Sequence, residues 1–260
     1  MFDLSKKSIL ITGSTGYLGS ELAKGLSALG AKIYINSRNE KKCRSLVREI
    51  QSLGGTAIVA CFDVTSDTEV AYFVRSINKL DVLVNNSYSG ASGTIKSSTS
   101  KDYITSYQSS VVASANLIKK LIPKFKVAVG INGYASIINI ASMYGMVSPD
   151  YRIYESDSST NPPFYGLAKA ALIQLTKYAA CEFAKDSIRV NSISPGPFPS
   201  TKIQNKKKQM VKKIIKKVPM ERIGKSNELV GPVAFLASDA SSYITGQEFY
   251  VDGGWLAKGL

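Results

Sequence analysis

The sequence predicts an α/β fold, a single doubly wound domain with a parallel sheet of about seven strands and helices on both faces. Three observations lead to this prediction. Short apolar runs alternate with longer segments of helical spacing along the whole chain. The runs are almost continuously apolar, as expected for strands buried on both faces. The first run leads directly into a glycine-rich turn that opens a helix.

The first strand is expected at residues 8–12, SILIT, because this run is short and β-branched. A helix should follow the glycine-rich turn and end near Leu29. By the same patterns the later strands are expected at 31–36, 56–61, 81–86, 135–142, 187–194 and 247–251. Helices are expected from the second strand to about Leu53 and near 66–78, 100–123, 164–185 and 226–237.

Length and composition favour a single domain that spans residues 1–260, because a chain with 44% hydrophobic residues is able to bury one substantial core. No apolar run reaches the roughly 18 residues of a membrane-spanning helix. The N-terminus passes into the first strand with no room for a signal peptide, so we expect a cytoplasmic protein without a membrane partner. The chain has no histidine, which excludes histidine-based triads and argues against a metal site.

The formal net charge of +14 is partly local, because residues 202–217 hold eight lysines and no acidic residue. A basic surface can attract nucleic acid, an acidic protein or phosphorylated metabolites. No nucleic-acid-binding module is recognisable in the sequence, and lysine runs are most often solvated helix faces. We therefore expect no nucleic-acid partner and a small-molecule substrate, for which an anionic carbohydrate is one candidate.

The segment TGSTGYLG (12–19) follows the first strand and opens a helix. Its three glycines permit a tight turn, a close approach to a pyrophosphate, and close packing of helix on strand. The helix N-terminus would add unpaired N–H donors for the phosphates. We expect a dinucleotide here, against the alternative of an ordinary βα turn. The expected contacts are Gly13, Ser14, Thr15, Gly16, Tyr17, Leu18 and Gly19.

The end of the second strand favours NADP(H) over NAD(H). An acidic residue at this place would bind the adenosine ribose hydroxyls. The chain instead has Asn36, Ser37 and Arg38, so a guanidinium is available for a 2′-phosphate. If Arg38 is only a solvated loop residue, NAD(H) still fits.

Two further motifs carry chemistry: Ser142 closes the run IINIAS, and Tyr165 and Lys169 lie one helical turn apart in YGLAKAAL. With the glycine-rich turn, these motifs resemble the short-chain dehydrogenase/reductase family over essentially the whole chain. The resemblance implies a Rossmann-like domain, a homodimer or homotetramer, and an enzyme that moves a hydride. It makes Tyr165 the general acid or base, with Lys169 favouring the phenolate and Ser142 holding the substrate oxygen.

The resemblance also assigns contacts to the cofactor beyond the glycine-rich turn. CFDVTS resembles the adenine-binding segment, VLVNNSYSG the Asn-Asn-Ala-Gly segment with Ser-Tyr in place of Ala-Gly, and SISPGPF the Pro-Gly segment near the nicotinamide. The residues implied are Asp63, Val64, Asn85, Asn86, Ser87, Pro195, Gly196 and Phe198, together with Tyr165 and Lys169.

The chain departs from the compact members of this family in features that face the substrate. Its glycine turn and its long interval from Ser142 to Tyr165 are similar to those of the longer members that act on nucleotide sugars. We expect a substrate insertion at about 143–164 and a lid at about 199–222, and the chain resembles oxidoreductases of flagellin and surface-glycan sugar modification. Candidate substrate contacts are Tyr88, Met143, Tyr144 and Arg152.

Ser110 stands where the family has a catalytic asparagine that supports a water beside the lysine. Its hydroxyl is able to hold a water in the same way. Two alternative functions stay open: a 3-oxoacyl-carrier-protein reductase, whose acidic partner would suit the basic surface, and a noncatalytic dinucleotide-binding regulator, which the loss of the asparagine would allow.

Overall fold

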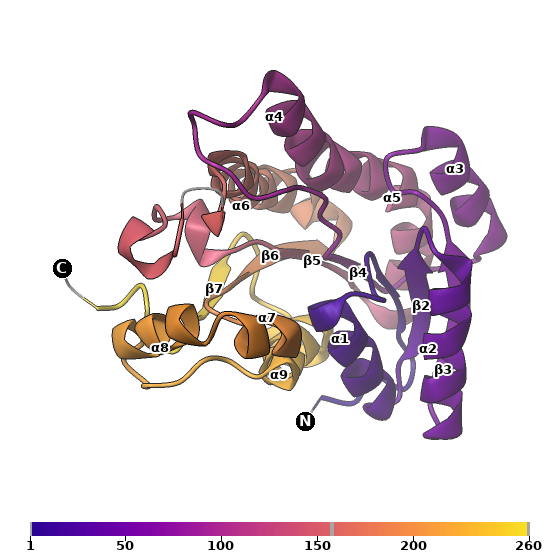
Figure 1. The fold of residues 1–260 in the computed structure, drawn as a ribbon. Helices are drawn as coiled ribbons and strands as arrows, with labels where there is room; N and C mark the ends of the chain where they lie inside the picture. Colours follow the sequence, from indigo (N-terminus) through magenta and orange to yellow (C-terminus); the bar gives the residue numbers. More distant parts are fainter. Residues whose placement is uncertain (1, 157–158, 259–260) are drawn as a thin grey trace.

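A seven-stranded sheet forms the centre of the protein, in the order β3-β2-β1-β4-β5-β6-β7 (Figure 1). The computed structural model describes residues 2–156 and 159–258. Each strand is parallel to its neighbours. The strands are β1 Ser8–Ile11, β2 Lys32–Ser37, β3 Thr56–Cys61, β4 Val82–Asn85, β5 Ala135–Ile140, β6 Ile188–Pro195 and β7 Glu248–Val251.

Helices cover both faces of the sheet, as the sequence predicts. The α-helices are α1 Tyr17–Ala28, α2 Glu40–Ser52, α3 Asp67–Ser76, α4 Ser100–Tyr107, α5 Ala113–Asn132, α6 Pro163–Phe183, α7 Thr201–Lys206, α8 Lys208–Lys217 and α9 Val230–Ala237. One buried cluster joins α1, α2 and α9 to the sheet, and a second joins α3, α5 and α6 to the opposite face. No helix among the described residues is both long and apolar enough to cross a membrane.

Alternation along the strands builds these two cores. In β1, Ile9 and Ile11 belong to the cluster under α1, whereas Leu10 belongs to the cluster under α5. Successive side chains of a strand point to opposite faces, so a strand covered on both sides must be apolar throughout. This is why the continuous apolar runs of the sequence locate the strands within one or two residues, and β3 at the predicted residues 56–61.

The segment expected as one helix at 100–123 differs from the prediction. It is divided into α4, a π-helical turn at Gln108–Val112, and α5, which continues to Asn132 with Pro123 inside it. A proline within a helix leaves the carbonyl four residues earlier without its N–H donor. Pro123 and Lys119 are both exposed, so water is able to bind that carbonyl.

At the amino-terminal edge of the sheet, the buried carboxylate of Asp81 joins β1, β4 and the end of α5. It accepts hydrogen bonds from the Ser8 amide (2.8 Å), the Ser8 hydroxyl (2.7 Å) and Asn132 Nδ2 (2.6 Å). Lys79 Nζ lies 2.9 Å away. Burial alone would raise the pKa of Asp81, but these hydrogen bonds outweigh it and lower the pKa below its usual 3.8.

The substitution Asp81→Asn should lower the free energy of unfolding at pH 7 by about 1.5–3 kcal/mol, because it removes hydrogen bonds to a buried charge. A lowered carboxyl pKa stabilises the fold above the unfolded pKa, and this contribution is lost as pH falls through the folded pKa. The difference from wild type should therefore shrink below pH 3.8 in urea titrations.

Asp67→Asn is the matched control, because Asp67 is 72% exposed and has only a distant partner in Lys120 at 3.7 Å. Its effect should stay within about 0.5 kcal/mol. Equal effects of the two substitutions at pH 7 would contradict the assigned role of Asp81.

Candidate active site

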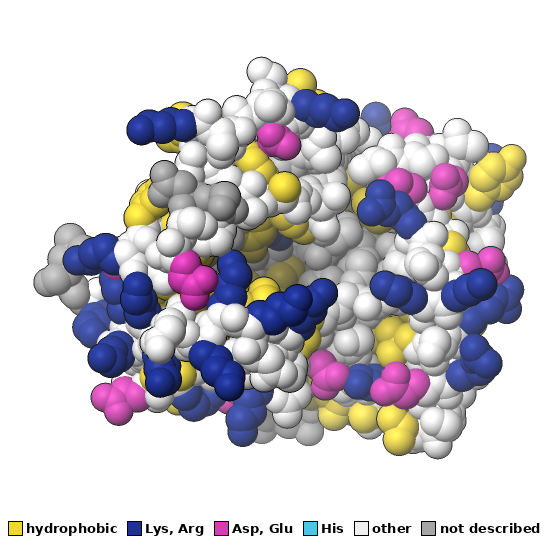
Figure 2. Space-filling view, viewed as in Figure 1, with side chains coloured by type: hydrophobic (Ala, Val, Ile, Leu, Met, Phe, Trp, Pro, Cys, Tyr) yellow, Lys and Arg dark blue, Asp and Glu magenta, His cyan; other side chains and the backbone are white. Residues whose placement is uncertain are grey.

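A cleft of ≈ 650 Å³ lies at the carboxyl ends of β1, β2, β3 and β4. Strand order reverses between β1 and β4, and ligands of such sheets bind at this switch point. Figure 2 shows the hollow opening between the side that carries α4 and the side that carries α7 and α8. The lining residues are Gly13, Thr15, Gly16, Tyr17, Leu18, Gly19, Asn36, Ser37, Arg38, Phe62, Asp63, Val64, Thr65, Asn86, Ser87, Tyr88, Ser89, Ile104, Thr105, Gln108 and Ser109.

The glycine-rich turn forms one wall of this cleft. Gly13 has a φ of +62°, which a residue with a side chain rarely adopts. A Cβ at Gly19 would lie 2.5 Å from the Gly13 carbonyl oxygen, so only glycine allows α1 to start this close to β1. Gly16 caps α1 without a side-chain hydrogen bond, and the first amides of a helix have no partner within it. The wall therefore presents N–H donors suited to phosphate.

Asn36, at the end of β2, holds this wall to the sheet. Its Oδ1 accepts the Gly13 amide at 3.3 Å, and its Nδ2 donates to the Ala60 and Phe62 carbonyls at 2.9 and 3.0 Å. Sequence reasoning noted only that Asn36 is not a carboxylate and missed this role. The available signal was an amide side chain directly after the apolar run 33–35 of this strand.

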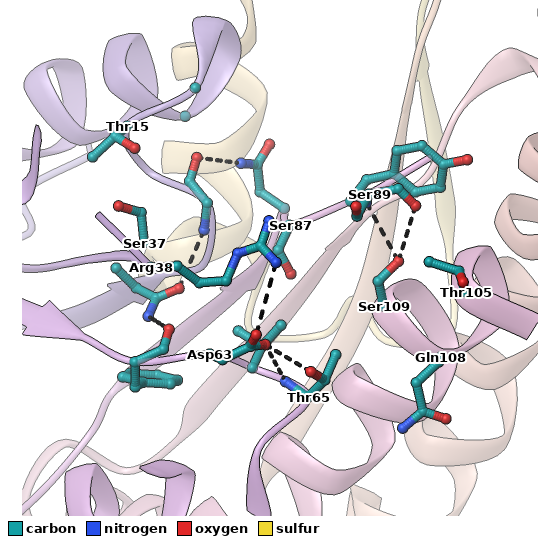
Figure 3. Close-up of a pocket in the computed structure, with 18 of the residues that line it drawn as sticks. Thr15, Ser37, Arg38, Asp63, Thr65, Ser87, Ser89, Thr105, Gln108 and Ser109 are labelled. Atoms are coloured by element: carbon teal, nitrogen blue, oxygen red, sulfur yellow. Dashed lines mark hydrogen bonds and ion pairs between the residues drawn. The ribbon is translucent and has the colours of Figure 1, made fainter. Parts of the chain in front are cut away.

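Arg38 and Asp63 lie next to each other in the lining of the cleft and form an ion pair (Figure 3). Arg38 Nη1 lies 3.8 Å from Asp63 Oδ2, and the Arg38 side chain is 71% exposed. Asp63 also accepts the amide and hydroxyl of Thr65, at 2.9 and 2.7 Å. The Ser37 hydroxyl accepts the Asn39 amide at 3.1 Å, which shapes the loop beneath Arg38. The guanidinium thus remains open to an anion.

The structure brings Ser142, Tyr165 and Lys169 together. Ser142 follows β5, and its hydroxyl accepts the Tyr144 amide at 3.2 Å. The same hydroxyl lies close enough to the Tyr165 phenol to influence its pKa. Lys169 Nζ lies 5.7 Å from the centroid of the Tyr165 ring. Burial raises the pKa of the Tyr165 phenol, and the nearby Ser142 hydroxyl lowers it in part.

Lys169 is 4% exposed, and its Nζ donates to the Ile140 carbonyl at 2.6 Å. This bond fixes the first turns of α6 against the end of β5. Burial disfavours the charged ammonium and lowers the pKa of Lys169 to about 8.

Tyr88 lies beside this trio. Its ring meets the Tyr165 ring edge to face, with centroids 4.8 Å apart and planes at 84°, and Lys169 Nζ lies 5.7 Å from its centroid. The Tyr88 hydroxyl is 3.2 Å from Ser106 Oγ on α4. Tyr88 lines the cleft, whereas Ser142, Tyr165 and Lys169 are not among its lining residues.

Ser110 lies in the π-helical turn, a feature that occurs frequently at functional sites. Its carbonyl accepts the Ser114 hydroxyl at 2.6 Å. Its own hydroxyl is buried and has no hydrogen-bond partner within residues 2–156 and 159–258. Buried polar atoms are normally satisfied, and a water is a suitable partner where protein supplies none.

Of the remaining residues predicted to contact the cofactor, some lie in the cleft and the others lie outside its lining. Asn86 and Ser87 lie in the cleft, and their amides donate to Thr12 Oγ1 at 2.9 and 3.0 Å. Asn85 is buried and donates to Asn139 Oδ1 at 2.9 Å, beneath the cleft. Ser14 is buried too, and Pro195, Gly196 and Phe198 lie at the end of β6 outside the cleft lining.

The segment between Ser142 and α6 carries three of the four predicted substrate contacts, Met143, Tyr144 and Arg152. Residues 157–158 of the predicted insertion lie outside the described residues. Met143 is buried, and the Tyr144 hydroxyl is 3.0 Å from that of Tyr154. Arg152 is 86% exposed and pairs with Asp150 at 2.9 Å.

The helix α8 of the predicted lid packs on this segment. Lys217 pairs with the Asp150 carboxylate, and Lys213 donates to the Arg152 carbonyl at 2.9 Å. Met210 and Val211 form the buried side of α8, while most of its lysines are exposed. Basic side chains also surround the lower rim of the hollow in Figure 2.

Sequence reasoning missed one wall of the cleft almost entirely. Figure 3 shows Thr105, Gln108 and Ser109 opposite the glycine-rich wall, with Ser109 joined to Ser89 by hydrogen bonds. The unpredicted lining residues are Asn36, Phe62, Thr65, Ser89, Ile104, Thr105, Gln108 and Ser109. No motif marks the residues of α4, because only packing brings this helix to the edge of the sheet. Across the part of the chain that the structure describes, no group of three or more His, Cys, Asp or Glu suits a metal ion.

Comparisons with known proteins extend over nearly the whole chain. The family described as enoyl-(acyl carrier protein) reductase matches residues 15–256. A tropinone reductase homolog of Arabidopsis thaliana is 32% identical over 259 residues, covering 98% of this chain and 91% of the relative. A 3-oxoacyl-[acyl-carrier-protein] reductase of Rickettsia bellii is 33% identical over 258 residues, covering 98% and 99%. The structure of a gluconate 5-dehydrogenase from Burkholderia cenocepacia, in complex with NADP and tartrate, matches with a TM-score of 0.88 and 28% identity, covering 99% of this chain and 98% of that one.

The buried Lys169 should make stability depend on alkaline pH. A lowered lysine pKa means that the fold disfavours the proton, so the cost is complete below pH 8 and disappears as pH rises to 10.5. Relative to Lys169→Met, wild type should therefore gain up to about 3 kcal/mol of unfolding free energy over this interval. Urea titrations of both proteins at pH 7, 9 and 10.5 measure the effect.

The comparison of two proteins at each pH cancels the titration of every other group. A stability difference that stays constant from pH 7 to 10.5 would show that Lys169 has an ordinary pKa.

Proposed function

Because this chain belongs to the short-chain dehydrogenase/reductase family, we propose that it is an NADP(H)-dependent oxidoreductase interconverting an alcohol and a carbonyl on a sugar, sugar phosphate or nucleotide sugar. The convergence of Ser142, Tyr165 and Lys169 at the end of β5, beside a cleft with unpaired helix amides, is the observation that carries the proposal. Flagellin or surface-glycan biosynthesis is the setting we propose for this activity.

The described residues suit a dinucleotide. The amides of the turn Gly13–Gly19 would hold its pyrophosphate, and Asp63 and Val64 would border the adenine. Arg38 is exposed in the cleft, and no carboxylate stands at the end of β2, which favours a 2′-phosphate. The related gluconate 5-dehydrogenase structure holds NADP. Such a cofactor supplies a hydride in reduction and accepts one in oxidation.

The phenol of Tyr165 moves the proton. Burial keeps this phenol protonated at neutral pH, so in the direction of reduction it donates to the carbonyl oxygen. The Ser142 hydroxyl holds the same oxygen where negative charge develops. In oxidation, the neighbouring Lys169 ammonium favours the phenolate that accepts the alcohol proton.

In this proposal, a water bound by the Ser110 hydroxyl connects Lys169 to solvent, so that a proton is able to return to the site. Its hydroxyl is buried in the π-helical turn, and the unsatisfied oxygen supports a water partner. A serine is shorter than the asparagine that it replaces, so a water rather than the side chain spans the extra distance. This retains a route from Lys169 to solvent without the family's usual residue.

The substrate class rests on the insertion 143–164 and the lid 199–222. Tyr144 and Tyr154 place two adjacent hydroxyls next to the catalytic helix, which suits a polyhydroxylated substrate. The lysines of α8 and Arg152 supply positive charge for an anionic group. Gluconate, named for a related structure, is itself a polyhydroxylated carboxylate.

A 3-oxoacyl-carrier-protein reductase is the second candidate. The family description and the relative from Rickettsia bellii both refer to acyl-carrier-protein substrates. The basic surface would attract an acidic carrier protein. The long insertion beside Tyr165 favours the carbohydrate over this alternative.

A homodimer or homotetramer is also proposed, with pairing through α5 and α6. The outward sides of these helices expose Val127, Ile131, Leu167 and Tyr178. Exposed apolar side chains on these helices would be covered in such an interface.

Arg38→Ala should weaken NADPH binding by roughly 10- to 100-fold, since it removes charge-assisted hydrogen bonds to the 2′-phosphate. NADH binding should not change. Isothermal titration of both nucleotides to both proteins measures this. Arg48→Ala, on the exposed side of the neighbouring helix α2, is the matched control. Equal affinity of wild type for the two nucleotides would contradict the choice of NADP(H).

Carbonyl sugars in free, phosphorylated and nucleotide-linked forms, together with a 3-oxoacyl thioester, should be tested for NADPH oxidation. We expect turnover of a sugar derivative and loss of roughly 10²- to 10⁴-fold in Tyr165→Phe, which lacks the acid. Tyr165→Phe should still bind NADPH. Turnover of the thioester alone would favour the second candidate, and binding without turnover of any carbonyl would make the protein a regulator.

The same panel tests the anionic substrate. Arg152→Ala should raise the KM for a phosphorylated sugar without changing that for its free counterpart, whereas the exposed Lys41→Ala should change neither. An equal change on both sugars would exclude recognition of the phosphate by Arg152.

A further inference from the structure

Tyr88 separates the cleft from the catalytic groups. It lines the cleft with the residues proposed to bind the adenosine half of a dinucleotide. Its ring also meets the Tyr165 ring at 4.8 Å between centroids, and Lys169 Nζ lies 5.7 Å from its centroid. Lys169 is 4% exposed, so its ammonium has almost no contact with the space in the cleft.

A hydrogen bond and a neighbouring glycine determine the position of the Tyr88 ring. The Tyr88 hydroxyl is 3.2 Å from Ser106 Oγ, and Ser106 in turn donates to the Phe164 carbonyl at 2.9 Å, directly before Tyr165. The ring also folds over Gly90, where a Cβ would lie only 2.2 Å from the Tyr88 hydroxyl oxygen. The absence of a side chain at Gly90 therefore permits this orientation.

We propose that Tyr88 is a gate that controls entry of the redox half of the dinucleotide to Tyr165 and Lys169. This inference rests on the proposed function, because it assumes that a nicotinamide cofactor occupies the cleft. The adenosine half would bind at the glycine-rich turn, Arg38 and Asp63 with the gate closed. The nicotinamide half requires the Tyr88 ring to leave Tyr165.

The contacts that close the gate are weak enough to open on binding. They include one edge-to-face aromatic contact, one bond between neutral hydroxyls and the approach of Lys169 Nζ to the ring, each a modest interaction. Opening requires rotation of a single side chain in the loop after β4. The affinity for a ligand that needs the open state is reduced in proportion to the fraction of protein that is open. A ligand confined to the adenosine half escapes this reduction.

Two ligands distinguish the halves of the site: NADPH, and 2′-phospho-ADP-ribose, which lacks the nicotinamide. Tyr88→Gly removes the gate, and Gly90→Ala displaces the ring while retaining the tyrosine. Both substitutions should tighten NADPH roughly tenfold and leave the affinity for 2′-phospho-ADP-ribose unchanged. Tyr88→Phe, which loses only the bond to Ser106, should tighten NADPH by a smaller factor. Isothermal titration with the purified full chain measures each affinity.

Gly130→Ala is the matched control for Gly90→Ala, because Gly130 is exposed on α5 and a Cβ there meets nothing within 4 Å. Unchanged NADPH affinity in both Tyr88→Gly and Gly90→Ala would overturn the gate. Weaker NADPH binding in both would overturn it as well, since the ring would then support the nicotinamide. If wild type bound neither ligand, the proposed function would fail first, before the gate is tested.

Discussion

Seven parallel strands end at one edge of the sheet, and the whole candidate site depends on this constraint. β1 to β4 deliver the glycine-rich wall, Arg38 and Asp63 to the cleft, while β5 delivers Ser142 to the same edge. A helix that precedes a parallel strand must begin at that edge, so the first turns of α6 carry Tyr165 and Lys169 to Ser142. Sheet direction alone thus brings together residues far apart in sequence.

The burial of Lys169 in the candidate site lowers the stability of the fold. Its ammonium lies within the protein with the Ile140 carbonyl as hydrogen-bond acceptor, and burial lowers its pKa to about 8. A methionine would fill this volume without that cost, so stability does not explain the lysine. The proposed chemistry would explain it, because a cation 5.7 Å from the centroid of the Tyr165 ring favours the charged phenolate over the neutral phenol.

The fold could be predicted because its signals are local. Apolar runs locate the strands, and the glycine-rich turn identifies the switch point before any contact is known. Other features needed tertiary information. The passage of α5 through Pro123 depends on the exposure of the preceding turn, and no local signal marks the π-helical turn at Ser110. The position of the Tyr88 ring depends on Gly90 and on Ser106 of α4. Asn36 could be interpreted as the lack of a carboxylate, but not as a clamp on Gly13.

In our proposal, the positive charge of the lid and the hydroxyls beside Tyr165 support different features of the substrate. Lys217 and Arg152 share the single carboxylate of Asp150, so this part of the surface keeps a net positive charge. A phosphorylated sugar and an acidic carrier protein would both be attracted to it. The groups beside Tyr165 differ in what they offer: the hydroxyls of Tyr144 and Tyr154 form a hydrogen-bonding wall. The two hydroxyls already pair with each other at 3.0 Å, but each oxygen is able to form a further hydrogen bond, which a polyhydroxylated substrate would use and an acyl chain would not. The proposal of a carbohydrate substrate rests on these two hydroxyls.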